Sequence, residues 1–371
     1  MKKILITMAS GPLATGIISA FRALDEPFHI IGLDSNPLHI HGADVDKRIL
    51  VPRIKAPEFF PMIRAIIAEE KPDFFWPLHD DEMPLFAEMK DLGVPMFLPD
   101  PETFRLTQDK MSATEHYKRH GVPVPDTIFI NNRPDLEQAF SKFGGEIWLR
   151  ANVGAGSKGA FRARNIDDAI RWLDLNKGWG EFTAAEVIPG ADCVVETVWD
   201  HGELMFAQSR IRPDGTSGEI GAGSKSRSTL ITGAPPAVFE VGVKAIKSVA
   251  ERPHGIMFVD QKIDSAGVPR VTEINTGRFS GGGMPTFHSQ GFNVAELVLK
   301  LGLGEDPGFI PPFIDPIPAG VYKLSGPGFP TLFVREEDFE PLKMELAQRM
   351  KRLKDLMQPV TRRTAKASSC R

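Results

Sequence analysis

The stretch that decides the fold is Met257-Phe-Val-Asp-Gln-Lys-Ile-Asp-Ser-Ala-Gly-Val-Pro-Arg-Val-Thr-Glu-Ile-Asn-Thr-Gly-Arg278, which predicts two strands joined by a glycine-containing turn. If the strands pair across the turn, Asp260 lies opposite Glu273, and Asn275 follows on the same face, because side chains alternate with a period of two. Such a cluster of oxygen ligands suits Mg²⁺ that carries nucleotide phosphates, with Arg278 as a phosphate partner. A solvated hairpin with its acids on the wet face is the alternative, and the spacing alone leaves both open.

The size and charge of the chain favour small-molecule chemistry. Its 371 residues are enough for two or three separate cores. Lys and Arg total 44 against 48 Asp and Glu, so the net charge is −4 and no nucleic-acid partner is expected. Two cysteines, Cys193 and Cys370, are too few for a disulfide framework and fit a reducing compartment. The first apolar run is broken by Thr7, and no later run approaches the roughly 20 residues of a membrane span, so we expect a cytoplasmic protein without a membrane partner.

The first hundred residues predict an open parallel sheet. A strand, a glycine turn and a helix at 14–24 precede a second strand at 29–34, which is a βαβ unit. A helix at 58–70 and a buried strand at 74–78 continue the pattern. The turn Gly11-Pro-Leu-Ala-Thr-Gly16 departs from the G-x-G-x-x-G spacing, so it gives little support to dinucleotide binding.

A glycine loop lies between two later predicted strands. The strand 147–150 leads into Gly154-Ala-Gly-Ser-Lys-Gly159, and a strand at 160–163 follows. A phosphate-binding P-loop leads into a helix instead, so this loop would be a flap whose backbone N–H groups can meet an anion. A flexible hairpin turn is the alternative. A helix over 110–120 precedes this pair and ends at Gly121-Val-Pro-Val-Pro125.

The C-terminal segment differs from the rest of the chain in charge. Residues 341–371 hold nine basic and two acidic side chains, so they carry +7 and the remainder about −11. Spacings of four, four, three and four indicate one apolar stripe on a helix, made of Leu342, Leu346, Met350, Leu353 and Met357. We expect this stripe to dock on its own domain or on a sister subunit of a homodimer, with a partner protein or a membrane surface as alternatives. Residues 361–371 are expected to be disordered.

Four motifs, in this order along residues 1–300, resemble those of the ATP-grasp superfamily, in its carbamoyl-phosphate-synthase-like branch of carboxylate–amine and amino-acid ligases. They are Asp109-Lys110 at the start of a helix, Leu149-Arg150 before the glycine loop, Glu186-Val-Ile-Pro-Gly-Ala-Asp192, and Glu273-Ile-Asn275 followed by Arg278. The resemblance implies an α/β and α+β fold with four regions: an N-terminal open parallel-sheet (pre-ATP-grasp) domain over 1–105, an ATP-grasp small lobe with the flap over 106–181, a C-terminal lobe with the metal site over 182–335, and a basic helix and tail over 336–371.

The resemblance also implies which residues bind ATP. Lys110 and Arg150 would contact the phosphates, and the flap would close over them. The backbone at Glu186 and Val187 would read the adenine edge, and Asp192 would hold the ribose, where the family more often has Glu. The positions matched in this way are Lys110, Arg150, Gly154, Gly156, Ser157, Gly159, Glu186, Val187 and Asp192.

The metal and the chemistry are implied in the same way. Asp260, Glu273 and Asn275 would hold two Mg²⁺ ions, with Mn²⁺ as a substitute. Asn275 and Arg278 would act catalytically, Arg278 on the γ-phosphate or the acyl phosphate. The family's usual Asn-Pro-Arg has one extra residue here, because Thr276-Gly277 separates Asn275 from Arg278.

The implied activity is an ATP-dependent carboxylate–amine ligase that works through an acyl phosphate on amino acids or short peptides and releases ADP and phosphate. Phosphorylation of a small acid by a synthase-like unit, or a catalytically silent nucleotide-binding subunit whose basic tail recruits a partner, are the alternatives. For the substrate, Arg210 and Arg212 alternate onto one strand face, and Lys225 and Arg227 follow in a glycine-rich loop. Guanidinium forks favour carboxylates, although arginines that are solvated or paired on a sheet surface would show the same pattern.

Overall fold

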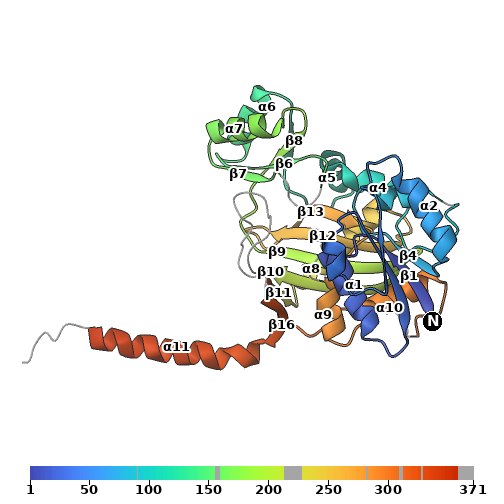
Figure 1. The fold of residues 1–371 in the computed structure, drawn as a ribbon. Coiled ribbons are helices and arrows are strands. Elements are labelled where there is room, and N and C mark those ends of the chain that lie inside the picture. The colour runs from blue at the N-terminus through green and yellow to red at the C-terminus, as the bar shows by residue number, and fades with distance from the viewer. Residues whose placement is uncertain are drawn as a thin grey trace, which may run out of the picture.

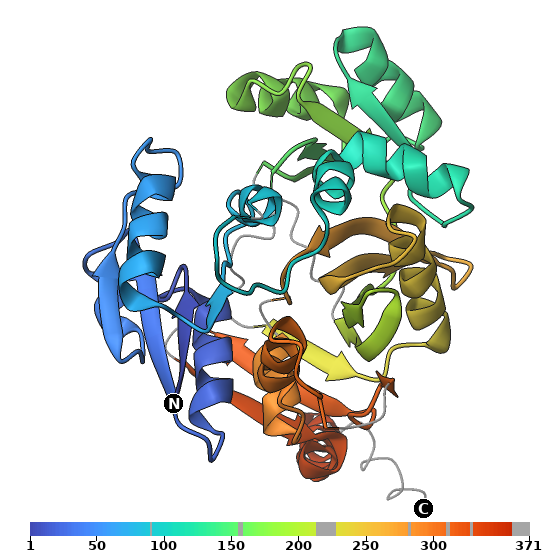
Figure 2. The same ribbon diagram turned by 90° about the vertical axis from the view of Figure 1, so that its right-hand side faces the viewer.

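The computed structural model describes residues 1–89, 91–154, 159–212, 228–280, 283–308, 312–326 and 329–357, which form three β-sheets with helices around them (Figure 1). The tail at 361–371 lies outside the described residues, as do four of the candidate site residues, Gly156, Ser157, Lys225 and Arg227. Figure 2 shows the first sheet at the left, the second at the top and the large third sheet below. Among the described helices, none has both the length and the apolar character that a membrane-spanning segment needs.

Four parallel strands form the first sheet, in the order β3-β2-β1-β4, which confirms the predicted open sheet. Its elements are β1 (Lys2–Ile6), α1 (Pro12–Arg22), β2 (Phe28–Asp34), the 3-10 helix η1 (His39–Gly42), β3 (Lys47–Leu50), α2 (Phe59–Glu70), β4 (Phe74–Trp76) and α3 (Met83–Glu88). The glycine turn after β1 is held by hydrogen bonds within the protein. Asp34 accepts them from the Ser10 amide at 3.1 Å and from the Ser10 hydroxyl at 2.6 Å.

The second sheet has four antiparallel strands in the order β5-β8-β6-β7. The elements of this region are α4 (Pro101–Gln108), α5 (Lys110–Arg119), β5 (Thr127–Ile130), α6 (Arg133–Lys142), β6 (Ile147–Ala151), β7 (Phe161–Ala163), α7 (Ile166–Asn176) and β8 (Phe182–Ala185). Asn132 and Asn165 cap α6 and α7 by accepting from the backbone amide three residues later. These helices and strands enclose a core of their own, which includes Leu136, Leu149 and Leu173.

The third sheet has eight strands in the order β13-β12-β9-β10-β11-β15-β16, with β14 beside β10. Its elements are β9 (Asp192–Asp200), β10 (Glu203–Arg212), β11 (Ser228–Thr232), α8 (Pro236–Val249), β12 (Gly255–Ile263), β13 (Pro269–Thr276), α9 (Gly283–Ser289), α10 (Val294–Gly302), β14 (Phe313–Ile314), β15 (Val321–Gly326) and β16 (Phe329–Arg335). α8 packs closely on one face, because a Cβ on Gly242 would come within 2.2 Å of Val195 Cγ1. The opposite face is therefore the one left for polar side chains and a ligand.

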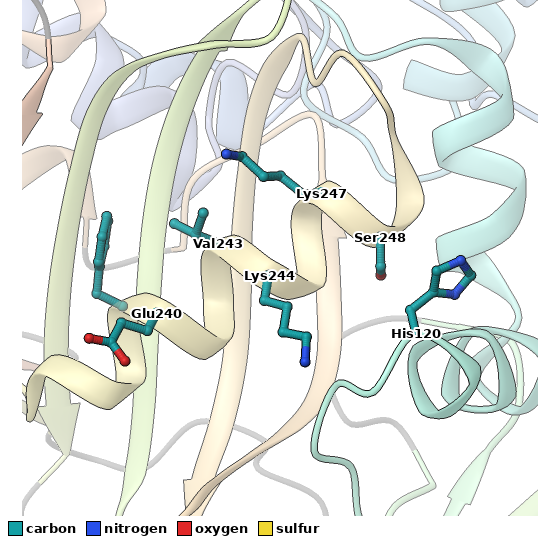
Figure 3. Close-up of a pocket in the computed structure, with 7 residues that line it drawn as sticks. His120, Glu240, Val243, Lys244, Lys247 and Ser248 are labelled. Carbon is teal, nitrogen blue, oxygen red and sulfur yellow. The ribbon is translucent and has the colours of Figure 1, made fainter.

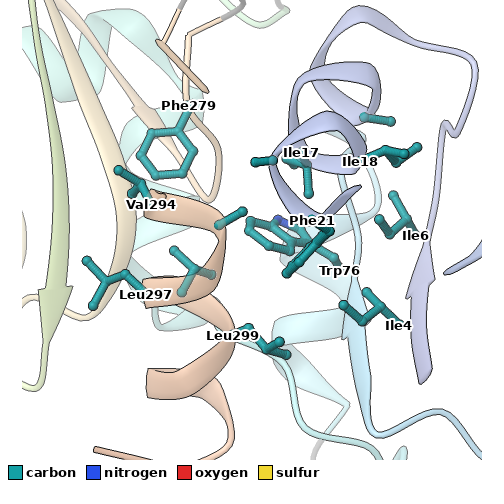
Figure 4. Packing of buried hydrophobic residues seen from close by; sticks show 14 of the residues in the cluster. Ile4, Ile6, Ile17, Ile18, Phe21, Trp76, Phe279, Val294, Leu297 and Leu299 are labelled. Atoms are coloured by element: carbon teal, nitrogen blue, oxygen red, sulfur yellow. The ribbon is translucent and has the colours of Figure 1, made fainter. Parts of the chain in front are cut away.

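One apolar core joins the first sheet to the third (Figure 4). Ile17 and Phe21 of α1 pack with Trp76 of β4 against Val294 and Leu297 of α10, and all five side chains are buried. Since this core is shared, the first hundred residues and the C-terminal lobe form a single packed body. The second sheet, with its separate core, is attached to that body through α4 and α5.

The last helix, α11 (Glu336–Met357), projects away from the three sheets (Figure 1). Leu342, Leu346, Met350 and Leu353 are each between 48% and 66% exposed. Docking of this stripe on its own domain was therefore a wrong expectation. A sister subunit, a partner protein and a membrane surface remain as the alternatives for covering it.

Candidate active site

The hairpin of β12 and β13 brings the predicted metal ligands together. Asp260 is paired with Glu273, as the alternation of the sequence predicts. The Asn275 amide lies between them and donates to Asp260 Oδ2 at 3.0 Å and to Glu273 Oε1 at 3.4 Å. Burial, and after it the negative charge of Glu273, raise the pKa of Asp260 to about 7. Two partly buried carboxylates held together in this way repel each other, so the site fits a hard divalent cation.

Lys110 and Arg150 border this carboxylate pair. Arg150 Nη2 donates to the Thr272 carbonyl at 2.9 Å, and its Nη1 lies 3.8 Å from Glu273. Lys110 Nζ donates to the Gly154 carbonyl at 2.6 Å, at the start of the glycine loop. Burial lowers the pKa of Lys110, an effect that the charge of Glu273 opposes and that of Arg150 reinforces. Two cations thus lie beside the acidic pair, on the side of the predicted flap.

The start of α5 is clamped to the strand that carries Arg150. Asp109 caps the helix by accepting from the Ser112 amide at 2.8 Å, and its other oxygen accepts from Asn152 Nδ2 at 2.6 Å. Asn152 in turn accepts from the Met111 amide at 2.8 Å. This clamp holds Lys110 and Arg150 at one place, although they are 40 residues apart in the sequence.

Arg278 links the third sheet to the first domain. Its Nη2 donates to Asn275 Oδ1 at 3.0 Å and to Asp80 Oδ2 at 3.2 Å. The side chain of Arg278 is 14% exposed, so it is largely enclosed at this junction. The extra residue between Asn275 and Arg278 therefore does not turn the guanidinium away from the carboxylates, because Asn275 itself holds it.

The residues predicted to hold the nucleoside already have partners within the protein. Asp192 accepts from Lys262 Nζ at 2.6 Å and lies 3.5 Å from Arg212 Nη1. The Glu186 amide donates to the Asp126 carbonyl at 3.0 Å, and its carboxylate accepts from the Asp126 amide at 2.9 Å. Glu186 therefore anchors the segment between β8 and β9, where the adenine is expected.

A second charged cluster is buried on the same face of the large sheet. Cross-strand pairing connects Asp260 to Val194, Val194 to Arg210 and Arg210 to Thr232, and paired residues share a face. Lys323 of β15 joins this face, since it pairs with the residue two positions before Thr232.

In this cluster, two cations face one carboxylate. Glu196 and Arg210 are fully buried and form an ion pair, and Lys323 is 5% exposed. Ser280 donates its amide to Glu196 at 2.7 Å and accepts from Arg210 at 2.7 Å. Within the described residues of the chain, Arg210 Nε and Nη1 have no partner. Burial lowers the pKa of Lys323 to about 8, and the charge of Arg210 contributes to this.

Sequence reasoning missed two residues of this buried cluster, namely Glu196 and Lys323. Glu196 stands among apolar residues in its strand and Lys323 between Tyr322 and Leu324, so a charge inside an apolar strand was the available signal.

A cavity of about 530 Å³ lies outside this site, between α8 and the end of α5 (Figure 3). His120, Lys244 and Lys247 are among the residues that line it. Because α8 covers the face of the large sheet opposite to Asp260, this cavity does not belong to the carboxylate site.

Comparison with known proteins places the fold. No family model matches the chain. Phosphoribosylamine–glycine ligase of Archaeoglobus fulgidus is 28% identical over 101 residues, which are 26% of this chain and 22% of that protein, so the match spans about a fifth of the relative. L-amino acid ligase from Bacillus licheniformis superposes with a TM-score of 0.67 at 16% identity, over 87% of this chain and 79% of that one.

A second solved structure is similar to the same extent. The biotin carboxylase domain of 2-oxoglutarate carboxylase from Hydrogenobacter thermophilus, which was solved with MgADP, ADP and bicarbonate, gives a TM-score of 0.66 at 17% identity, over 87% of this chain and 73% of that one. The chain therefore has the ATP-grasp fold, as its motifs predict.

Proposed function

We propose that this protein is an ATP-dependent carboxylate–amine ligase that forms an acyl phosphate and releases ADP and phosphate. The observation that carries the proposal is the pair of Asp260 and Glu273, bridged by Asn275 and bordered by Lys110 and Arg150. Oxygen ligands beside cations are what a site needs in order to hold Mg²⁺ and phosphates together. The ATP-grasp fold and the ligases among the similar proteins support this assignment.

The proposed reaction has two steps, formation of the acyl phosphate and its reaction with the amine. A carboxylate oxygen of the donor attacks the γ-phosphorus, the bond to the β,γ-bridging oxygen breaks, and ADP leaves. The amine of the acceptor then attacks the acyl carbon, phosphate leaves, and the nitrogen loses a proton. Mg²⁺, or Mn²⁺ in its place, when bound by Asp260, Glu273 and Asn275, would neutralise phosphate charge.

The side chains of the protein would neutralise charge and orient ATP and the substrates. Lys110 and Arg150 would neutralise the anions that must meet in the first step. Arg278, oriented by Asp80 and Asn275, would face the transferred phosphoryl group. The backbone that follows Glu186 would read adenine, and Asp192 would reach the ribose only by sharing its contacts with Lys262 and Arg212.

For the substrate we propose amino acids or short peptides, in line with the names of two of the similar proteins. The cluster of Glu196, Arg210 and Lys323 has an excess positive charge within the described residues, so it would accept a substrate carboxylate. Arg212 remains a second candidate on the same face. The predicted contributions of Lys225 and Arg227 remain proposals.

The test is ADP release from ATP and Mg²⁺ with pairs of L-amino acids, with bicarbonate alone, and with no acid, followed by mass spectrometry of the products. We expect ADP, phosphate and a condensed product. A donor labelled with oxygen-18 in its carboxylate should pass one labelled oxygen to phosphate, because this oxygen stays on phosphorus when the acyl phosphate reacts. Glu273→Gln is the matched inactive control.

Each other outcome has its own meaning. AMP and pyrophosphate as products would refute the acyl-phosphate route. ADP release with bicarbonate alone would favour phosphorylation of a small acid. ATP binding without turnover under every condition would favour a silent nucleotide-binding subunit.

A further inference from the structure

The exposed helix α11 has an apolar stripe that the rest of the described chain does not cover. Its 22 residues extend for about 33 Å. It is attached at its base, where Phe339 packs edge-on against Tyr322 with 4.7 Å between ring centroids. Beyond that turn, Leu342, Leu346, Met350 and Leu353 are 66%, 61%, 48% and 52% exposed. Most of the stability of a helix in a protein comes from the packing of its apolar face, so we expect a cover for this stripe.

Charge is segregated along this helix. Residues 336–345 contain five acids and one lysine, whereas residues 346–353 contain basic residues and no acid. Glu340 pairs with Lys343 and Glu345 with Arg349 inside the helix. The segregation suits the helix dipole, but the dipole gives no reason for the apolar stripe.

We propose that the α11 of a second copy of this chain covers the stripe, packed antiparallel. The stripe is nearly symmetric about its centre, because the spacings of its four described residues are four, four and three. In an antiparallel pair, Leu342 of one copy meets Leu353 of the other, and Leu346 meets Met350. Both copies then use the same surface, as a twofold interface requires.

The charges select this orientation and this occupant. An antiparallel pair places the acidic half of each helix on the basic half of the other, whereas a parallel pair would place like charges together. A membrane surface would be attracted by the basic half but repelled by the acidic half. A second copy satisfies both halves at once.

The first experiment measures the mass of the full chain in solution over a concentration series. We expect dimers of twice 40.9 kDa that dissociate on dilution, because the interface is small. The double variant Leu346→Asp, Met350→Asp should be monomeric with unchanged ATP binding. Ala347→Asp, an exposed position beside the stripe, is the matched control and should still dimerise.

The second experiment tests the orientation by disulfide crosslinking in a Cys370→Ser background. Leu342→Cys and Leu353→Cys proteins should crosslink when they are mixed, and neither should crosslink efficiently alone. Crosslinking of each variant with itself would show a parallel pair and overturn the proposed geometry. A monomeric wild-type chain, or a double Asp variant that remains dimeric, would overturn the proposal itself. If the wild-type chain is monomeric and binds anionic phosphatidylserine vesicles through α11, a membrane surface is the cover instead.

Discussion

Asp260 and Glu273 make the candidate metal site unfavourable for folding when no cation is bound. The pKa of Asp260 is raised from 3.8 to about 7, so between these pH values the folded protein holds a proton that the unfolded chain lacks. The penalty for an ionised Asp260 is therefore fully present above pH 7 and is relieved as the pH falls toward 4.

Glu273→Gln should accordingly raise the melting temperature of the protein without nucleotide at pH 8 and have little effect at pH 5, while ADP release is lost. Thermal unfolding at both pH values measures this. Asp264→Asn in the same hairpin is the control and should lower the melting temperature at pH 8, because hydrogen bonds from the Val268 amide and Arg270 lower the pKa of Asp264. A lower melting temperature for Glu273→Gln at pH 8 would show that the pair has a structural role.

The burial of Lys323 also costs stability, but with the opposite dependence on pH. Its pKa falls from 10.5 to about 8 on folding, so the cost of its burial is full below pH 8 and disappears as the pH rises toward 10.5. We expect Lys323→Met to raise the melting temperature at pH 7 and to lose this advantage near pH 10. Lys262→Met, which removes an ion pair to Asp192 at 2.6 Å, should lower it at pH 7. If Lys323→Met lowers the melting temperature at pH 7 as Lys262→Met does, a partner within the protein compensates the cost of burying the Lys323 charge.

Lys110 and Arg150 are the two residues that we expect to contact the phosphates of ATP. Lys110→Met and Arg150→Met should each weaken ATP binding by about 10- to 100-fold, since a charge-assisted hydrogen bond contributes about 1.5–3 kcal/mol. Calorimetric titration with ATP and Mg²⁺ measures the affinity. Lys118→Met is the control, because that exposed side chain pairs with Asp126 and lies outside the site. Unchanged affinity in both variants would remove the phosphate assignment.

At the scale of elements, close packing of α8 on the large sheet overrides helix propensity. Alanine in place of glycine inside a helix stabilises by about 1 kcal/mol on propensity alone. At Gly242, however, a Cβ would come within 2.2 Å of Val195 Cγ1, and such overpacking costs about 1–3 kcal/mol. We therefore expect Gly242→Ala to lower the free energy of unfolding in urea. Gly42→Ala, where a Cβ has no atom within 4 Å, should leave it nearly unchanged. A more stable Gly242→Ala protein would mean that α8 can shift outward.

Elements also show what sequence patterns could predict. The alternation in β12 and β13 was enough to pair Asp260 with Glu273, because the period of a strand is a local property. α4 and α7 were not predicted. α7 begins at the capping residue Asn165 and α4 at Pro101, signals that were present in the sequence.

At the scale of the whole molecule, the first domain and the C-terminal lobe share one apolar core, so we expect them to unfold as a single cooperative unit. Phe21 is 1% exposed within this core, so Phe21→Ala should cost about 3–5 kcal/mol. Hydrogen exchange should then become faster in both β1 and α10. Leu136→Ala, in the separate core of the second sheet, should leave exchange in β1 and α10 unchanged. Faster exchange in β1 alone would show that the domain and the lobe unfold independently.

The sequence by itself determined the open parallel sheet and the acidic hairpin, because strand alternation and glycine turns are local properties, and the order of its four motifs resembles that of the ATP-grasp fold. Only the tertiary structure showed that Asp80 of the first domain reaches Arg278, and that Lys323 lies on the same sheet face as Arg210. Asp80 and Arg278 are 198 residues apart in the sequence, and Arg210 and Lys323 are about a hundred residues apart. No local pattern encodes which distant segments become neighbours. Burial likewise depends on what packs above a side chain, which is why Arg210 proved to be fully enclosed and the α11 stripe exposed.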